Sequence, residues 1–118
     1  MIFAKINGKL YPATVSGKVA DKDWDNRSTK AITVEMDYAT ASKLFVDGLA
    51  WSIVQHEEVP VFDENGNHTG TETKETEFDN SEYNIAGDIT DHRDGTITAK
   101  MGALTLLEEA YEIMLGGM

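Results

Sequence analysis

Apolar and polar side chains alternate along much of the chain, which is the pattern of half-buried β-strands. The clearest case lies in residues 30–36, where Ile32, Val34 and Met36 alternate with polar residues. Further strand-like stretches are residues 2–6, 9–19, 49–59 and 82–101. The pattern therefore predicts a chain built mainly of strands.

Three Asn-Gly or Asp-Gly pairs mark tight turns, at residues 7–8, 65–66 and 94–95. Such pairs tolerate the positive φ angles of two-residue hairpin turns, so the chain is predicted to contain three hairpins. Pro12 lies in the second strand of the first hairpin. Because proline has no N–H to donate, we expect that strand to be an edge strand or to have a bulge there.

Two segments change to the helical period. Ala41, Leu44 and Phe45 are spaced for one face of a short helix, and Thr105 with Glu108 has the spacing of a capping box before a second helix. The second segment places its apolar side chains along one stripe: Leu106, Leu107, Ala110, Tyr111, Met114 and Leu115. The stripe predicts an amphipathic helix at the C-terminus.

These elements predict a mainly β protein of the α+β class. We expect antiparallel strands in a β-sandwich or small barrel, with one short helix and the C-terminal amphipathic helix. The 118 residues fit a single domain, 1–118. Strand order and the choice between sandwich and barrel stay open.

Residues 57–82 are the most polar stretch, rich in Thr and Glu and centred on Asn65-Gly66. Two strands meeting at this turn would make a protruding acidic hairpin, and an irregular loop is the alternative. Because such an arm buries little apolar surface, we expect it to contact a partner. The candidate contact residues are Phe62, Asp63, Glu64, Asn65, Gly66, Asn67, His68, Glu72, Lys74, Glu75 and Glu77.

Acidic residues are concentrated in one part of the chain. Residues 57–94 hold twelve Asp or Glu against Lys74 and Arg93, a balance of −10 within a formal net charge of −11. This region should repel nucleic acid and anionic membranes and attract basic partners. We therefore expect no direct nucleic-acid binding and no membrane binding.

The densest group of chemically capable side chains is DITDHRDG, residues 88–95. Asp88, Asp91 and Asp94 recur every third residue, which does not match the alternate ligand positions of a helix–loop–helix calcium loop. On a strand, Asp88 and Asp91 fall on opposite faces, and Asp94 belongs to the turn. The pattern favours a turn, with an ion site as the alternative.

Motifs for catalysis or cofactor binding are missing from the sequence. There is no cysteine, no P-loop, no G-x-G-x-x-G and no G-x-S-x-G, and the three histidines are not at metal-ligand spacing. We therefore expect no enzymatic activity, no cofactor and no metal. Without a bilayer-spanning apolar run or a signal-peptide pattern, the protein is expected in the cytoplasm when it is synthesised.

Several segments resemble small proteins encoded in prophages of Gram-positive gut bacteria, which are tail-related or uncharacterised. They are NGKLYPA, KAITVEMDYATASKLFVDGLAWSIVQ, FDENGNHTGTETKETEFDNSEYNIAGDITDHRDGTITAKMG and the amphipathic end. The resemblance implies a sandwich or barrel with a long hairpin that reaches a neighbouring subunit. Residues 57–82 would serve this purpose in a tail, connector, baseplate or accessory component incorporated into a virion.

Three functions are open on this basis. The first is a non-enzymatic phage structural or assembly protein, whose partners are other phage subunits or further copies of itself. The second is a small acidic inhibitor of the immunity or DNA-mimic type, favoured by the twelve acids of residues 57–94. The third is a small enzyme or sugar-binding β domain, which would require a concave pocket.

Overall fold

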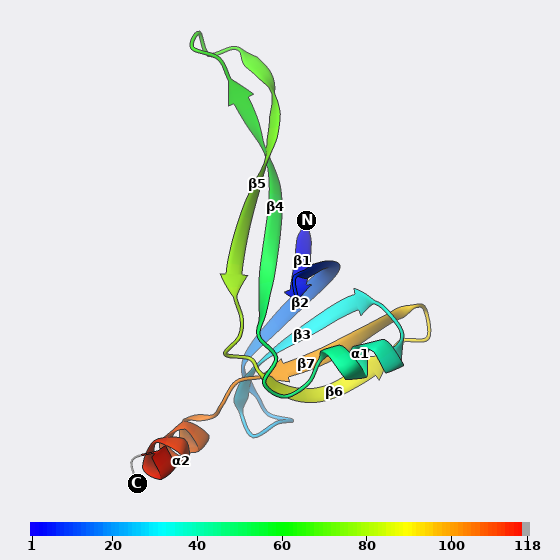
Figure 1. Cartoon of the computed structure of the whole chain (residues 1–118), viewed down its shortest axis with the longest axis vertical. Coiled ribbons are helices and arrows are strands. Elements are labelled where there is room, and N and C mark those ends of the chain that lie inside the picture. Colours follow the sequence, from blue (N-terminus) through cyan, green and yellow to red (C-terminus); the bar gives the residue numbers. More distant parts are fainter. Residues whose placement is uncertain (117–118) are drawn as a thin grey trace.

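The computed structural model describes residues 1–116. Its elements are β1 (Ile2–Ile6), β2 (Lys9–Asp21), β3 (Arg27–Glu35), α1 (Tyr38–Leu44), β4 (Trp51–Phe62), β5 (His68–Asp79), β6 (Ile85–Asp91), β7 (Thr96–Gly102) and α2 (Leu106–Gly116). The described strands form one antiparallel sheet with the order β5-β4-β1-β2-β3-β7-β6 (Figure 1). The predicted mainly β, α+β class is confirmed. The strands form one continuous sheet with β5 and β6 at its edges, in place of the expected sandwich or closed barrel.

The core lies on one face of this sheet. Residues opposite each other in register share a face, and Ile32 pairs with Ala99 while Val34 pairs with Ile97. The buried apolar cluster consists of Ala4, Ile6, Ile32, Val34, Ala41, Phe45, Leu49, Trp51, Ile97, Ala99 and Met101. The Trp51 indole N–H donates to the Tyr83 carbonyl at 2.9 Å, so the largest core side chain leaves no buried donor unpaired.

The short helix α1 covers part of the core face, against β6 and β7 (Figure 1). Asp37 caps it, because its carboxylate accepts from the Thr40 N–H at 2.7 Å. After the helix, Asp47 accepts from the Ala86 N–H at 2.8 Å and Gly48 donates to the Asn84 carbonyl at 2.7 Å. These two bonds attach the end of the helix segment to β6.

The prediction for Pro12 is wrong, because β2 is an interior strand between β1 and β3. Pro12 pairs with Phe3 of β1, but the register with β3 begins only at Ala13 opposite Val34. The missing N–H therefore falls just beyond the end of the β2–β3 ladder. The one register shift recorded between these strands lies further along, between Lys18 and Asp21.

The second hairpin is longer than the part of it that packs on the body. The register of β1 with β4 ends at Ile2 opposite Gln55, and the Met1 carbonyl accepts from the His56 N–H at 2.9 Å. Beyond this point β4 pairs with β5 alone, so residues 57–74 project as a two-stranded ribbon (Figure 1). We call residues 57–74 the free arm.

Of the two alternatives for residues 57–82, hairpin or irregular loop, the chain forms the hairpin. Its C-terminal limit differs from the expected one. β5 ends at Asp79, and Asn80 is buried and donates its N–H to the Trp51 carbonyl at 2.9 Å. Residues 80–82 thus belong to the body.

Helix α2 occupies the predicted position but stands apart from the sheet (Figure 1). The side chains of its apolar stripe are exposed, with exposed fractions of 86% for Leu106, 81% for Leu107, 63% for Tyr111 and 71% for Met114. The side chain of Leu115, also placed on the stripe, lies outside the described residues. The amphipathic pattern therefore does not correspond to packing within this chain.

Candidate interaction surface

Two elements project from opposite ends of the body (Figure 1). The free arm extends from one end and α2 from the other, and the molecule measures 63 × 40 × 26 Å along its principal axes. Neither element supplies a member of the buried apolar cluster. Exposed elements that do not stabilise a core are candidates for contacts with other molecules, so the free arm and α2 are both candidate interaction surfaces.

The tip of the free arm is folded by Asp63. Its Oδ1 accepts from the backbone N–H groups of Asn65 and Asn67, each at 2.9 Å, and its own N–H donates to the Asn67 carbonyl at 2.9 Å. The Asn67 N–H is the main cause that lowers the pKa of Asp63 below its usual value. Gly66 adopts φ +81°, as the turn requires. Asp63 is therefore a structural residue of the turn.

The free arm carries a few apolar side chains. On one face Val59 lies opposite Glu72 and Val61 lies opposite Gly70, so that two half-buried aliphatic side chains accompany an acid. At the end of the ribbon the Phe62 and His68 rings have centroids 5.8 Å apart, and Phe62 stays 58% exposed. The arm thus offers a small apolar area bordered by carboxylates.

Two of the expected contact residues bind the chain's own body instead. The Glu77 carboxylate lies 3.0 Å from Lys5 Nζ, and the Glu75 carboxylate lies 3.4 Å from His56 Nε2. The candidate residues therefore separate into three groups. Phe62, Asp63, Glu64, Asn65, Gly66, Asn67 and His68 form the tip, Glu72 and Lys74 lie along the ribbon, and Glu75 and Glu77 lie at its base.

The two edges of the free arm are not equally open to backbone pairing. The backbone N–H and C=O of His56 bond to Met1, on the side away from β5. Because these groups alternate in direction along a strand, those of Glu57, Val59 and Val61 point toward β5. The nitrogen of Pro60 therefore points to the outer edge of β4. A proline nitrogen has no hydrogen, so this edge cannot donate a hydrogen bond to a further strand at Pro60. No further strand pairs with β5 within residues 1–116. The outer edge of β5 is the open one.

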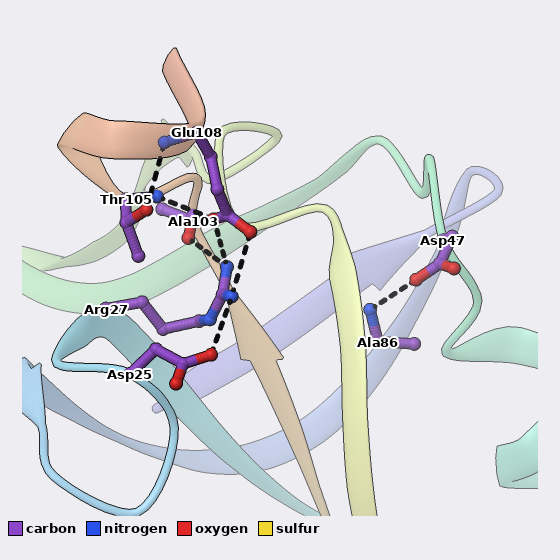
Figure 2. Close-up of polar contacts among 7 residues, drawn as sticks. All are labelled: Asp25, Arg27, Asp47, Ala86, Ala103, Thr105 and Glu108. Atoms are coloured by element: carbon purple, nitrogen blue, oxygen red, sulfur yellow. Dashed lines mark hydrogen bonds and ion pairs between the residues drawn. The ribbon is translucent and has the colours of Figure 1, made fainter. Parts of the chain in front are cut away.

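At the other end, α2 is attached through Arg27 at the start of β3 (Figure 2). Arg27 Nη1 and Nη2 donate to the two carboxylate oxygens of Glu108 at 2.8 and 3.1 Å, and Nη1 also donates to the Ala103 carbonyl at 3.0 Å. The guanidinium lies 4.7 Å from the Trp24 ring. This bidentate, stacked geometry fixes where the helix begins.

The same carboxylate completes the cap of α2. The Thr105 N–H donates to Glu108 at 2.9 Å, and the Glu108 N–H donates to the Thr105 hydroxyl at 3.2 Å, which is the predicted capping box (Figure 2). The adjacent Arg27 lowers the pKa of Glu108 to about 2. The sequence predicted the capping box and the apolar stripe but assigned no contact to this helix. The signal for such a contact was the stripe itself, for which the described part of the chain has no matching apolar surface.

The side chains of residues 88–95 serve the β6–β7 hairpin. The Asp94 carboxylate accepts from the Thr96 N–H at 2.9 Å, and that of Asp91 accepts from the Arg93 N–H at 2.9 Å. His92 Nε2 lies 2.7 Å from the Thr98 hydroxyl. Among the described residues, no group of three or more His, Asp or Glu side chains could hold a metal ion.

Comparison with known proteins adds no family. No protein-family model, no curated protein and no solved structure matches the chain significantly. Within the part of the chain that the structure describes, no helix is long and apolar enough to cross a membrane.

Proposed function

We propose that this protein is a non-enzymatic structural or assembly subunit that uses its free arm to contact neighbouring subunits. One observation carries the proposal: residues 57–74 form an ordered ribbon that leaves the body and has one open backbone edge. The proposed setting is a tail, connector or accessory part of a virion, and it rests on the resemblance of several sequence segments to prophage proteins. The partners are then other virion subunits or further copies of this chain.

Backbone pairing supplies the contact energy in this proposal. A two-stranded ribbon is marginal in water, and a third strand added at its open edge would satisfy further N–H and C=O groups. The alternation along β5 directs the backbone groups of Thr71 and Thr73 outward, because Lys74 lies opposite Glu57, which bonds toward β5.

The charge of the arm restricts its partner. Glu57, Glu58, Glu64 and Glu72 lie on the ribbon or its tip, with Lys74 as its one basic residue besides histidine. Two such arms repel each other, so the acidic ribbon favours a less acidic face of the next subunit. This charge also opposes premature pairing of arm with arm.

The acidic-inhibitor function has weaker support. A mimic of DNA needs free carboxylates on a rigid surface, whereas Asp63 and Asp94 accept hydrogen bonds within their own turns. Glu77 pairs with Lys5 of the same chain, and the Glu75 carboxylate lies 3.4 Å from His56 Nε2. On the open edge strand Glu72 lies between Thr71 and Thr73, as expected for an edge that must stay soluble.

Shortening the arm tests the proposal. Replacing residues 58–73 with Asn-Gly joins Glu57 to Lys74, which form a hydrogen-bonded pair and so suit a two-residue turn. We expect a thermal midpoint close to that of the full chain, because the removed residues bury little, and a lower mean mass in light scattering at the same protein concentration, because association through the arm is lost. A shortened chain that associates as the full chain does, or a full chain that stays monomeric at every concentration and salt and binds no phage structural protein, would contradict the proposal.

A pair of point variants separates edge pairing from other roles of the arm. Thr73→Pro removes one outward N–H without removing a bond to β4, and Thr73→Ala is the matched control that keeps it. We expect the proline variant to associate about tenfold more weakly, which is about 1.4 kcal/mol, and the alanine variant to behave like the wild type. Equal weakening in both would assign the effect to the side chain.

A further inference from the structure

The exposed stripe of α2 needs a cover that the described chain does not supply. An isolated helix of 11 residues is marginal in water, and most helical stability in proteins comes from packing an apolar face. Leu107 and Tyr111, with Leu104 of the preceding linker and Glu108, line an open, mainly apolar depression. Arg27 holds the start of the helix at the end of the sheet.

The charge of α2 narrows the class of partner. The helix has Glu108 and Glu109 in its first turn, and residues 106–116 contain no Lys or Arg. Amphipathic helices that lie on membranes have basic residues on their polar face, and nucleic acid repels carboxylates. The surface that covers α2 must therefore combine apolar groups with basic ones.

One depression on this chain has that composition. It is lined by residues of β2 and β3 and by Tyr83, and it contains Lys18, Val19 and Lys30. Val19 is 92% exposed, and Lys30 Nζ lies 5.3 Å from the centroid of the Tyr83 ring. No ion pair of Lys18 or Lys30 is found among the described side chains. We call this depression the basic hollow.

The basic hollow and α2 lie at the same end of the molecule. Ser28 lines the hollow, and its carbonyl accepts from the N–H of Ala103, three residues before α2 begins, at 2.9 Å. A patch that carries both an acidic apolar helix and a basic hollow is self-complementary. Two copies of such a patch pair about a two-fold axis, since the helix of each copy meets the hollow of the other.

We infer that two copies of this chain form a symmetric dimer in which α2 of each copy packs its apolar stripe on the basic hollow of the other. Leu107 and Tyr111 cover Val19, while Glu109 approaches Lys30. This contact lies at the end of the body opposite to the free arm. It is therefore a second interface, independent of the arm contacts proposed above.

Cysteine cross-linking of full-length chains tests the contact, because the native sequence has no cysteine. One chain has Val19→Cys, the other has Tyr111→Cys and a size tag, and the two are mixed and mildly oxidised. We expect a mixed disulfide in most of the protein, at least about tenfold above a control that mixes Tyr111→Cys with Val46→Cys, another exposed apolar position. A yield equal to the control overturns the inference, and so does efficient cross-linking of Tyr111→Cys with itself, which would indicate pairing of α2 with α2.

Charge reversal gives a second measurement that does not depend on disulfide geometry. We expect Lys30→Glu to abolish the cross-link, and Glu109→Lys on the helix-bearing chain to restore it in part. Both positions are exposed or half-buried, so the fold should persist, which circular dichroism checks. An unchanged cross-link after reversal overturns the inference. The arm-shortened chain should form the same cross-link, so failure of the arm proposal and failure of this one give different results.

Discussion

At the scale of single residues, Arg27 makes the most consequential set of contacts. It is 5% exposed, and its guanidinium joins β3 to the Ala103 carbonyl and the Glu108 carboxylate while it stacks on Trp24. Arg27 and Glu108 are 81 positions apart in the chain. A charge-assisted bidentate pair of this kind, rather than an apolar contact, decides where α2 lies.

The Arg27–Glu108 pair predicts a pH dependence. The folded pKa of Glu108 is about 2, below the ordinary value of 4.5, so its contribution to stability is fully present above pH 4.5 and is lost as pH falls toward 2. Amide hydrogen exchange in α2 should therefore accelerate between these pH values. Arg27→Met should bring the pKa of the Glu108 carboxyl, measured by NMR, back toward 4.5. A wild-type carboxyl that titrates near 4.5 would show that the pair does not form.

At the scale of elements, the connection between β2 and β3 folds back onto the sheet. Asp21 is 1% exposed and accepts from Lys100 Nζ at 2.8 Å, a hydrogen bond that lowers the pKa of Asp21 and raises that of Lys100. Trp24 in this connection lies over Gly87 of β6 and Gly102 of β7. Because neither glycine has a side chain, the indole can pack directly against both.

This packing predicts a sharp difference between two glycines. A Cβ at Gly87 would lie 2.7 Å from Trp24 Cζ3 and 3.1 Å from the Lys100 carbonyl, so Gly87→Ala should cost about 1–3 kcal/mol of unfolding free energy. Gly17→Ala is the control, since its Cβ would meet the flexible end of Lys30, at 3.1 Å. We expect it to change stability by less than about 0.5 kcal/mol. Equal effects in urea denaturation would refute the Trp24 packing.

At the scale of the whole molecule, charge and shape act together. The net charge of −10 carried by residues 57–94 lies on the free arm, the base of its hairpin and the β6–β7 hairpin, while the rest of the chain is nearly neutral. Copies of net charge −11 repel one another at long range, and this repulsion weakens as salt shortens the screening length from about 30 Å at 0.01 M to about 10 Å at 0.1 M.

Association should therefore strengthen as salt rises over this range. Light scattering at fixed protein concentration should give a higher mean mass at 0.1 M than at 0.01 M salt, because the approach of like-charged copies becomes less costly. The opposite trend would indicate that attraction between the acidic arm and a basic surface, rather than repulsion between copies, dominates the association.

The sequence by itself determined the local structure. The three hairpins, the alternation in residues 30–36 and the Thr105–Glu108 capping box depend on neighbours within a few positions, so all appear where they are predicted. Only Asn7-Gly8 forms the predicted two-residue turn, since the other two hairpins close through longer loops. It also located the acidic hairpin, because polar residues in such number cannot be buried.

The tertiary structure decided everything that depends on distant partners. It set the strand order, made β2 an interior strand despite Pro12, and assigned Glu75 and Glu77 to the body through His56 and Lys5. It also left the stripe of α2 uncovered. Periodicity shows that a face is apolar, but which surface covers that face depends on contacts such as Arg27–Glu108, whose partners no local pattern connects.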